Sequence, residues 1–594
     1  MTSPLGFTRP SLPKISRRDL VRAAGLGAGA LAVPSVLTAC SGGDDPGSGE
    51  SAKGIENVEP KQLGAETPGV IYADGYIGPR ASAKEKFGDG STTFKVVVPQ
   101  DAQVVGDWNK NNKMTQWMEE RTGVKVEFVS VLTTASDGST DMTKINAMLA
   151  SGELPDAFMS LPFSSDQVSL YGQQGIFIAL DDYIQTYAPE MRRMVAEYPD
   201  FKLLNTATDG KQYQFSGIND CYHCRCGSGR AWINTEYLEK VGAKMPTTTE
   251  ELRSVLKAFK DNDPTPKKNI IPFASTVGDQ VDQYIMNAFL YNPGGGINGG
   301  WLALADGKVE LVAIKPEWRE ALRFLRQLFD DGTVTRQTFT MTADTLLQVG
   351  NQGRVGFVRI WFTGGSVADI KYEEGALWRK YAIVPPLKGP AGFQNAKWDY
   401  YGYRTGGLLI TNKCAQPEIL VQWADAQMEL EAIMRGYAGE KKGNWDWSKE
   451  GTKGINDKQA LYNVSVSPAP KSTSWLQYSV MYRSNDFRLG QEIDPKVPNF
   501  EAGLYQASTE YEPFAEPQDQ QLPPLIFDES TAAAKADTAA SIYQQVRQKI
   551  AQFAVGELDI NDDNAWNDYV KSFDAMGLSN YLDIYQQAYD KAPK

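Results

Sequence analysis

The sequence predicts an α/β fold, in which strands and helices alternate along the chain. An apolar, β-branched run at 94–98 is followed by helical spacing of Met114, Trp117 and Met118, and then by alternating apolar and polar residues at 124–128. A strand, a helix and a strand within about 35 residues form a unit that joins two parallel strands. The same alternation continues along the chain, so we expect the α/β class throughout.

The later elements follow from the same patterns. A helix that ends before Gly152 is followed by a strand at 154–158. Thr247 and Glu250 form a capping-box pattern ahead of an amphipathic helix at 252–259. The remaining elements are expected as helices at 318–329, 417–430, 542–553, 566–573 and 581–589, and as strands at 355–362, 381–384 and 406–411.

Length and composition indicate a folded chain with more than one hydrophobic core. The chain has 594 residues, of which 42% are hydrophobic and 22% are charged. Its net charge of −13 argues against a nucleic-acid partner, because phosphate neutralisation needs a basic surface. A single histidine, His223, limits histidine-based catalysis and metal binding, whereas 13 Trp and 27 Tyr supply flat rings.

Residues 1–39 have the pattern of an export signal. Basic residues precede or enter a short apolar stretch, 23–39, which is too short and too rich in Gly and Ala for a comfortable membrane span. Ser16–Val21 resembles a twin-arginine signal, and Leu37–Cys40 resembles a bacterial lipobox. The second resemblance implies cleavage before Cys40 and lipidation of its thiol; the alternative is an uncleaved anchor. We expect an extracytoplasmic protein, lipid-anchored to the cell membrane and exported by the twin-arginine or the general secretory route.

After the lipidated cysteine, residues 40–90 are predicted to form a flexible tether. Residues 41–51 are rich in Gly, Ser and Asp and have no apolar periodicity. The folded body is expected to start near Thr93. Removal of residues 1–39 leaves 55 basic and 72 acidic residues, a net charge of −17 that keeps an exported protein soluble.

Four stretches of the sequence match motifs of one protein family. The segment Ala147–Phe158 is similar to the motif "ASGDLPD", and Asp209–Tyr213 to "DGKIY". Residues 231–252 are similar to "LWIRKDWLDKLGLKMPTT", and 574–585 to the closing motif "MGLxxYLxIYQ". By these motifs the chain resembles the extracellular solute-binding lipoproteins of bacterial ABC importers, in the branch of longer members associated with oligosaccharide uptake. The stretches occur in the family's order from about residue 94 to 589, which covers nearly the whole mature chain.

This resemblance implies a periplasmic-binding-protein-like fold, with two α/β lobes joined by a hinge around a central cleft. Lobe one is expected at 91–217 with 385–440, and lobe two at 220–380 with 445–594. The implied function is capture of an oligosaccharide or related glycan-derived solute between the lobes, for delivery to the membrane subunits of an ABC permease. The implied protein is a monomer without enzymatic activity.

Aromatic and polar residues near strand ends are the candidates for ligand contact. Sugars present an apolar C–H face to an aromatic ring and hydroxyls to polar side chains. Each aromatic has core packing as its alternative, but we expect at least two of the four tryptophans to line the cleft. The candidates are Asp107, Trp108, Trp361, Trp398, Asp399, Tyr401 and Trp445.

Four cysteines remain after Cys40, and three of them lie close together. Cys221, Cys224 and Cys226 flank His223, and Cys414 is distant in sequence. An oxidising compartment favours a disulfide, which we expect from Cys221 or Cys224 to Cys226 or Cys414. Free thiols and a metal site are the alternatives; a zinc site is disfavoured because its ligands normally come from two separated segments.

A calcium loop typical of related long members is only partly retained. Asp261, Asp263 and Asn269 remain of its oxygen ligands, whereas the Asn-Gly pairs and the final acidic ligand are missing. A plain loop is therefore favoured over a calcium site, and no cofactor is expected. Two other functional classes stay open: a secreted glycosidase, which needs two suitably spaced carboxylates, and a surface sensor or adhesion protein without a transporter.

Overall fold

The computed structural model describes most of the chain after residue 54. The described residues are 55, 58–82, 85–100, 107–133, 141–226, 229–278, 280–295, 300–371, 373–401, 404–465, 470–476, 478–493 and 500–592. The expected export signal at 1–39 and Cys40 lie outside them. None of the helices in the described ranges has both the length and the apolar character that a membrane span requires.

The first lobe is built on a six-stranded sheet with the order β14-β4-β11-β3-β1-β2. Its strands are β1 (Thr93–Pro99), β2 (Lys125–Val131), β3 (Ala157–Met159), β4 (Phe215–Asn219), β11 (Arg404–Ile410) and β14 (Tyr482–Arg483). Strands β1 and β2 are parallel, in a register that runs from Thr93 opposite Lys125 to Pro99 opposite Val131. Helix α2 (Lys113–Thr122) connects them, which confirms the predicted strand–helix–strand unit. Strand β11 is antiparallel to both of its neighbours.

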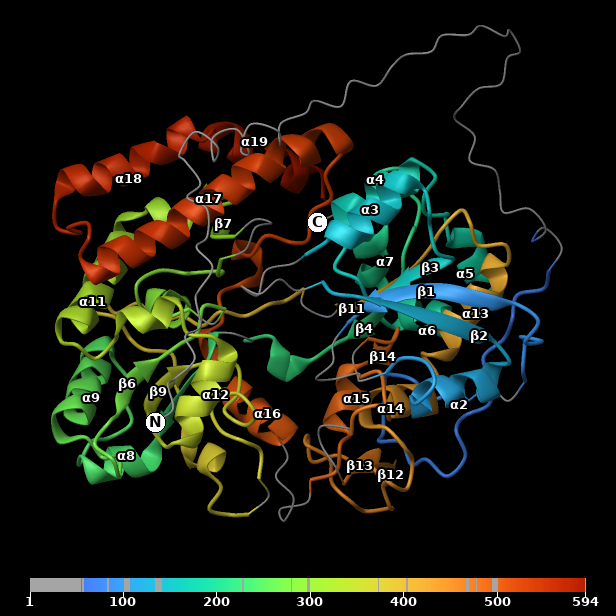
Figure 1. Ribbon diagram of the computed structural model, residues 1–594, viewed down its shortest axis with the longest axis horizontal. Helices are drawn as coiled ribbons and strands as arrows, with labels where there is room; N and C mark the ends of the chain where they lie inside the picture. The colour runs from blue at the N-terminus through green and yellow to red at the C-terminus, as the bar shows by residue number, and fades with distance from the viewer. Residues whose placement is uncertain are drawn as a thin grey trace, which may run out of the picture. The chain divides into compact units, whose positions relative to one another are not determined.

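Helices cover both faces of this sheet (Figure 1). They include α3 (Thr143–Ser151), α4 (Ser165–Gln173), α5 (Asp181–Tyr187), α6 (Pro189–Glu197), α7 (Pro199–Asn205), α13 (Pro417–Ala426), α14 (Leu430–Ala438) and α15 (Asn485–Leu489). In β1, Val96 and Val98 pack into one hydrophobic cluster, and Val97 packs into another on the opposite face. Burial on both faces explains why this strand is a continuous apolar run and does not alternate.

The second lobe is built on a four-stranded sheet with the order β10-β5-β9-β6. Its strands are β5 (Ala231–Asn234), β6 (Ile271–Ala274), β9 (Val355–Arg359) and β10 (Tyr381–Val384). Its main helices are α8 (Thr235–Lys240), α9 (Thr249–Asn262), α10 (Asp282–Ile285), α11 (Pro316–Asp330), α12 (Ala343–Asn351), α16 (Phe500–Tyr511), α17 (Glu529–Val555), α18 (Asp563–Ala575) and α19 (Leu578–Lys591). Two small hairpins complete the fold: β7 (Leu302–Ala305) with β8 (Lys308–Leu311), and β12 (Trp445–Trp447) with β13 (Tyr462–Val464).

The capping box of α9 lies one residue later than predicted. Thr248 is the N-cap, and its hydroxyl accepts the Glu251 N–H at 3.2 Å. The Glu251 carboxylate accepts the N–H groups of Thr247 and Thr248 in return. Thr247 and Glu250 have the right residue types but are offset by one position, which sequence spacing alone did not resolve.

The chain passes between the lobes three times, and two of the expected lobe boundaries are wrong. Between the described elements, the crossings lie between β4 and β5, between residue 400 and β11, and between α15 and α16. Residues 385–400 belong to the second lobe and not to lobe one, because Leu387 and Trp398 are buried in its core. Residues 445–493 belong to the first lobe, because β14 pairs with β4 and Trp475 is buried in the first-lobe core.

The segment expected to be a flexible tether packs against the first lobe over its described part, 58–82 and 85–90. Tyr76 is buried, and the Ile77 N–H donates to the Asp486 carboxylate at 2.9 Å. The Leu430 N–H of α14 donates to the Ala81 carbonyl at 3.2 Å. In its described part the segment forms no regular helix or strand, and its backbone groups bond the lobe and, around the Glu66–Ala81 bridge, one another.

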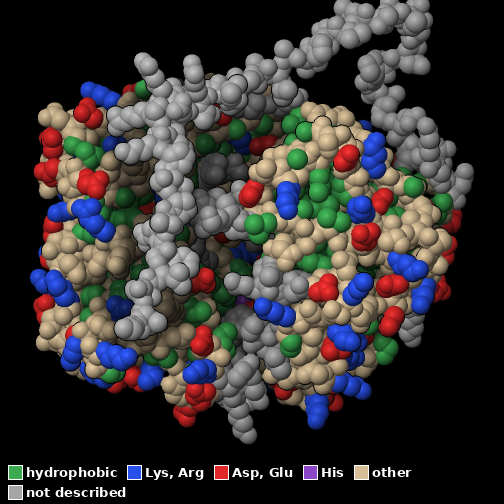
Figure 2. Space-filling view, in the orientation of Figure 1, with side chains coloured by type: hydrophobic (Ala, Val, Ile, Leu, Met, Phe, Trp, Pro, Cys, Tyr) green, Lys and Arg blue, Asp and Glu red, His purple; other side chains and the backbone are tan. Residues whose placement is uncertain are grey.

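Basic and acidic side chains are mixed on the face of the molecule in Figure 2. Described Lys and Arg residues on that face alternate with Asp and Glu and form no continuous basic stripe. This distribution agrees with the mixed charged composition of the chain, 60 Lys and Arg and 73 Asp and Glu.

Candidate functional site

The exposed tryptophan of the candidate set, Trp361, lies at the carboxyl end of β9. Ligands of open α/β sheets bind outside the carboxyl ends of the strands. Trp361 follows the end of β9 by two residues and is 44% exposed. It is the one exposed tryptophan among the described residues. It therefore offers a free aromatic surface at the edge where a ligand is expected.

The backbone around Trp361 is held on both sides by buried side chains. The Trp232 indole N–H donates to the Ile360 carbonyl at 3.0 Å, and Arg230 Nη1 donates to the Trp361 carbonyl at 3.1 Å. The Phe362 ring lies 5.9 Å from the Trp361 ring, centroid to centroid. These contacts place the indole on a fixed backbone, so a ligand that stacks on it need not order a mobile loop.

The other three candidate tryptophans are buried in this structure, and the expectation that at least two of the four line the cleft stays a prediction. Trp108 is 3% exposed and lies in a first-lobe aromatic cluster. Trp398 is 3% exposed and packs edge-on against the Tyr222 ring at 5.5 Å. Trp445 is 1% exposed, and its indole N–H donates to the Gly439 carbonyl at 2.9 Å. Large aromatic rings stabilise cores as readily as they bind ligands, and sequence position does not separate the two roles.

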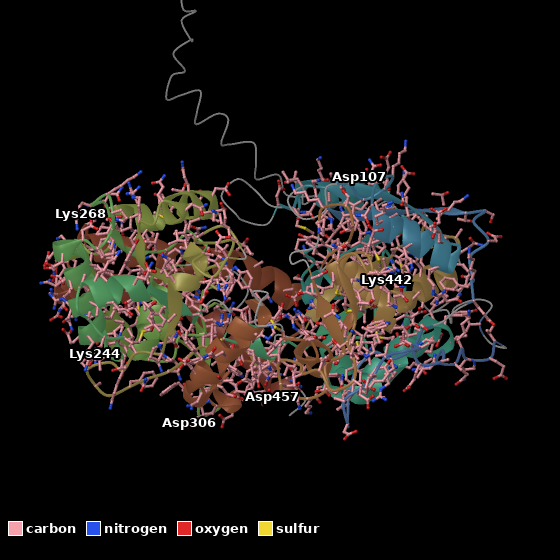
Figure 3. The ribbon with its side chains drawn as sticks, turned by 90° about the horizontal axis from the view of Figure 1, so that it is seen from below. Asp107, Lys244, Lys268, Asp306, Lys442 and Asp457 are labelled. Carbon is pink, nitrogen blue, oxygen red and sulfur yellow. A yellow bond between two sulfur atoms is a disulfide. The ribbon has the colours of Figure 1, made fainter. Side chains whose placement is uncertain are left out.

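The two acidic candidates stabilise turns of their own segments, and Tyr401 bonds a distant segment. The Asp107 carboxylate accepts the Asn109 N–H at 2.8 Å ahead of α2, at the site labelled in Figure 3. The Asp399 carboxylate accepts the Tyr401 N–H at 2.9 Å. The Tyr401 hydroxyl accepts a hydrogen bond from the Gln518 amide at 3.3 Å. The Asp107 and Asp399 bonds are Asx-type turn interactions, which local sequence does not distinguish from ligand contacts. The Tyr401 bond instead joins two residues that are 117 positions apart.

Sequence analysis missed Lys397, which lies near the second crossing between the lobes. Its side chain runs between Gly229 and Gly294: a Cβ at Gly229 would lie 3.2 Å from Lys397 Cβ, and one at Gly294 would lie 3.1 Å from Nζ. Burial lowers the pKa of the ammonium, the Asp399 charge raises it, and the Arg359 charge lowers it further. An ammonium held in this way can donate hydrogen bonds to ligand hydroxyls. No motif in the sequence marks this position.

A buried carboxylate lies near the same edge of the second lobe. Both oxygens of Asp282 in α10 are buried without a hydrogen-bond partner in the described structure. Burial raises the pKa of this carboxyl, and the charges of Arg547 and Arg359 lower it. Arg359, the last residue of β9, donates to the Gln283 side chain. Around Arg359, at the end of β9, the second lobe thus brings together a cationic, an anionic and an amide group.

A buried ionic network joins the segments that cross between the lobes. Arg488 of α15 donates to Glu501 of α16 at 2.7 Å and to the Asn219 side chain at the end of β4 at 2.6 Å. Glu501 also bonds His223 Nε2. The pKa of the Glu501 carboxyl is well below its usual range, because the Arg488 and His223 interactions outweigh the effect of burial. Breaking a buried charge network costs several kcal/mol, so this one fixes the crossing geometry.

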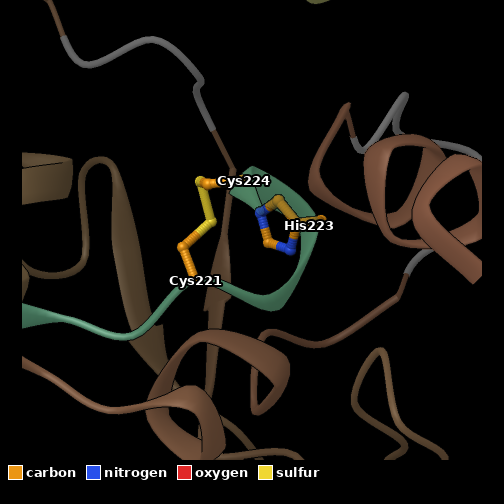
Figure 4. A group of neighbouring side chains, drawn as sticks. All are labelled: Cys221, His223 and Cys224. Carbon is orange, nitrogen blue, oxygen red and sulfur yellow. A yellow bond between two sulfur atoms is a disulfide. The ribbon is translucent and has the colours of Figure 1, made fainter. Parts of the chain in front are cut away.

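The disulfide joins Cys221 to Cys224, which corrects the expected pairing (Figure 4). We expected a partner in Cys226 or Cys414, but both are free thiols. Cys226 accepts a hydrogen bond from Arg230 Nε at 3.0 Å, and burial raises the pKa of the Cys414 thiol to about 12. A short 3-10 turn at Tyr222–Cys224 brings the two bonded cysteines together, with Cα atoms 5.1 Å apart. Spacing alone did not predict this turn.

The same turn contains the group of donor atoms that most resembles a metal site in the described ranges. Donor atoms of Cys221, His223 and Cys224 lie within 4.8 Å of one another. Both sulfurs are bonded to each other, however, so they are not available as the thiolates that zinc requires. In the oxidised protein these residues do not fit a zinc ion.

The remnant of the calcium loop is stabilised by its own donors. The Asp263 carboxylate accepts the Thr265 hydroxyl and N–H at 2.6 and 2.9 Å and the Ile270 N–H at 3.0 Å. The Lys268 ammonium donates to the Asp263 carbonyl at 2.5 Å. Burial raises the pKa of Asp263, but these hydrogen bonds outweigh it and lower the pKa overall. Calcium needs six to eight oxygen ligands, whereas here N–H, O–H and ammonium groups occupy the oxygens.

Comparison with known proteins places this geometry in context. A family model described as bacterial extracellular solute-binding protein matches residues 91–426. The fructooligosaccharide ABC transporter substrate-binding protein FusA of Streptococcus pneumoniae is 25% identical over 508 residues, covering 80% of this chain and 86% of the relative. The polygalacturonan/rhamnogalacturonan-binding protein YtcQ of Bacillus subtilis is 28% identical over 256 residues, covering 42% of this chain and 47% of the relative.

Solved structures show the same two-lobed fold. The structure of Streptococcus pneumoniae FusA in complex with kestose has a TM-score of 0.68 at 23% identity, covering 84% of this chain and 99% of that chain. An extracellular solute-binding protein from Bifidobacterium longum subsp. infantis has a TM-score of 0.69 at 19% identity, covering 86% of this chain and 100% of that chain.

Proposed function

Because this chain belongs to the family of bacterial extracellular solute-binding proteins, we propose that it binds an oligosaccharide or related glycan-derived solute between its lobes. The bound solute is then delivered to the membrane subunits of an ABC permease. Binding and release are sufficient for this role, and the protein performs no catalysis. The named relatives are binding proteins, which favours this function over a secreted glycosidase.

The observation that best supports a sugar ligand is Trp361. Its exposed indole projects from a backbone fixed by Arg230 and Trp232, at the carboxyl edge of the second-lobe sheet. The C–H face of a pyranose or furanose ring packs on such a surface, and Lys397 supplies hydrogen-bond donors near the second crossing. Ligand contacts made from both lobes favour the closed arrangement, so binding shifts the population of lobe positions towards closure.

The location of the protein follows from the same proposal. Cys40 is lipidated after export by the twin-arginine or general secretory route, and the lipid holds the binding unit at the cell membrane. The described chain that follows the expected anchor packs against the first lobe, where the Lys61 N–H donates to the Thr186 carbonyl of α5 at 2.8 Å and the Ala81 carbonyl accepts the Leu430 N–H of α14 at 3.2 Å. The mature protein acts as a monomer without a cofactor.

Substitution of Trp361 tests the proposal. Trp361→Ala removes the stacking surface, and we expect the Kd for a bound oligosaccharide to rise about 30-fold, equivalent to about 2 kcal/mol. Trp361→Phe retains a smaller aromatic ring and is expected to lose less affinity than Trp361→Ala. Trp117→Phe is the matched control, because the Arg435 guanidinium covers this indole on the outer helix α2 at 4.9 Å.

The first measurement is a thermal-shift screen of the mature protein with fructo-oligosaccharides, uronate oligomers and neutral plant glycans, followed by calorimetry of the hits. A ligand at 100 times its Kd adds about 2.7 kcal/mol of stability. Failure of every glycan to shift the melting temperature would reject the sugar ligand. Equal affinities of the wild-type protein and Trp361→Ala for a confirmed ligand would reject the role of Trp361.

A further inference from the structure

The Cys221–Cys224 disulfide lies on the first crossing segment, between β4 of the first lobe and β5 of the second. It closes a ring of four residues, Cys-Tyr-His-Cys. In the chain-entropy account, a cross-link stabilises a fold more when it closes a longer loop, so this short ring contributes less than most structural disulfides. Its position at the hinge and its small structural contribution suggest a role other than stapling the fold.

The two cysteines of the disulfide differ in exposure. Cys221 is 3% exposed, whereas Cys224 is exposed. Thiol–disulfide exchange requires an incoming thiolate to reach one sulfur in line with the bond. Cys224 is therefore the sulfur that an external thiolate attacks, and Cys221 is the leaving group that stays inside the protein.

Three arginines lie at this turn, and two of them are paired with carboxylates. Arg225 follows Cys224 directly and pairs with Asp220 at 3.1 Å. Arg230 donates to the His223 carbonyl, and Arg488 Nη2 lies 3.0 Å from His223 Nε2. Nearby cations stabilise a cysteine thiolate, and a stabilised thiolate leaves more readily. Figure 4 shows the His223 ring beside the disulfide, within the same turn.

We propose that Cys221–Cys224 is a thiol–disulfide exchange site that takes an external thiol as its substrate and that its redox state adjusts the hinge. An external thiolate attacks Cys224 Sγ, which forms a mixed disulfide and releases Cys221 as a thiolate. A second external thiolate attacks the external sulfur of the mixed disulfide and releases Cys224 as a thiolate. The external thiols leave as their disulfide, so two electrons pass to the protein, and the two thiolates take up solvent protons according to their pKa values.

The contacts of the turn link this chemistry to the lobes. His223 bonds Glu501 of the second lobe through Nε2, and its carbonyl accepts from Arg230 at the start of β5. The Arg225 carbonyl accepts the Asp399 N–H of the second crossing at 2.8 Å. Reduction frees the turn from its covalent ring, so these three contacts lose a rigid support. The predicted effect of reduction on ligand affinity rests on the proposed function. The thiol–disulfide exchange does not, so it is measured without a ligand.

The chemical test uses the mature, folded protein with reduced glutathione or dithiothreitol, followed by alkylation and intact mass measurement. We expect both Cys221 and Cys224 to be reduced and alkylated without denaturant, whereas Cys226 and Cys414 stay unlabelled. In matched variants treated with oxidised glutathione, Cys221→Ser is expected to form a mixed disulfide at Cys224, and Cys224→Ser is expected to form none. A disulfide that resists both reductants until the protein is unfolded would overturn the proposal.

The hinge effect is tested with a ligand from the screen. We expect the Kd of the reduced protein to differ from that of the oxidised protein by about threefold to tenfold, and the Cys221→Ser, Cys224→Ser double variant to match the reduced protein. Equal Kd values would overturn the control of the hinge. Exchange at Cys224 in a protein that binds no glycan would leave the exchange site standing and reject the proposed function.

Discussion

An ion pair between the lobes provides the sharpest test of how they are held together. Lys535 of α17 in the second lobe pairs with Asp166 of α4 in the first lobe, with Nζ and Oδ2 2.6 Å apart. Asp166 also accepts the Phe527 N–H at 3.2 Å. The Lys535 ammonium lies 3.5 Å from the centroid of the Phe527 ring. This contact, which we name the interlobe clasp, lies outside the three crossing segments.

The expected energy of the clasp follows from its burial. The Lys535 side chain is 6% exposed and that of Asp166 is 16% exposed, so water screens the pair only weakly. Loss of one partner of a buried ion pair costs about 3–5 kcal/mol. Asp166→Asn keeps an oxygen that can accept the Phe527 N–H and removes only the charge. We therefore expect a loss of stabilisation at the lower end of this range, about 3 kcal/mol. If the clasp forms when the lobes close, this loss corresponds to a rise in Kd on the order of 100-fold.

The assay combines ligand affinity with lobe separation. Calorimetry gives the Kd of the wild-type protein, Asp166→Asn, Lys535→Met and the double variant, and a double-mutant cycle isolates the coupling between the two side chains. Small-angle X-ray scattering reports how far the lobes separate without a ligand. Glu557→Gln is the matched control, because its pair with Arg336 lies within the second lobe and is 54% and 70% exposed on the two sides. Exposed pairs contribute about 0–1 kcal/mol, so this variant should behave as wild type.

Comparison of the double variant with the two single variants shows whether Asp166 and Lys535 are coupled. We expect it to recover part of the loss, because Lys535→Met removes the unpaired buried ammonium that Asp166→Asn creates. Additive single effects with no coupling, or an unchanged Kd with unchanged scattering in Asp166→Asn, would refute the clasp as a contact that holds the lobes together. A lower melting temperature with an unchanged Kd would show that the pair stabilises the fold in all lobe positions.

Two further predictions concern stability and calcium. Burial raises the pKa of Asp425 to about 7, with hydrogen bonds from the N–H groups of Met191 and Glu190 opposing it. The folded state then binds a proton that the unfolded chain releases near its ordinary pKa of 3.8, so stability falls as pH rises from about 4 to about 7. Asp425→Asn should abolish about 4 kcal/mol of this pH dependence in urea unfolding; an unchanged slope would contradict the assignment. Added calcium or a chelator should leave the melting temperature unchanged, because Lys268 and backbone N–H groups occupy the Asp263 oxygens; a calcium-dependent rise would contradict this.

Local sequence patterns were sufficient for most secondary elements. The Val96–Val98 run, the helix from Lys113 to Thr122 and the amphipathic helix α9 were predicted because their periodicity and capping residues lie within a few positions of one another. Trp361 was predicted within the end of a strand, and in the structure it follows the end of β9 by two residues. These features depend on neighbours along the chain, which the sequence contains directly.

Local sequence patterns did not predict the contacts between segments that are distant in the sequence. Helix α6 starts at Pro189 after Ala188, which has no side chain able to cap it; Asp425, more than 230 residues away, accepts its first free N–H groups instead. The burial of Trp108 and Trp398 likewise depends on which rings meet them from other segments. No local spacing specifies such partners, because each position is compatible with several neighbours.

The sequence by itself determined the α/β class, the family resemblance and the order of the elements. The tertiary structure decided which lobe residues 385–400 and 445–493 join, which tryptophan remains exposed, and that Cys221 bonds Cys224. The physical reason is that hydrogen bonding and periodicity act over one or two turns of chain. Burial and pairing are instead settled by the free energy of the whole packed unit, in which each segment competes for partners brought together only by folding.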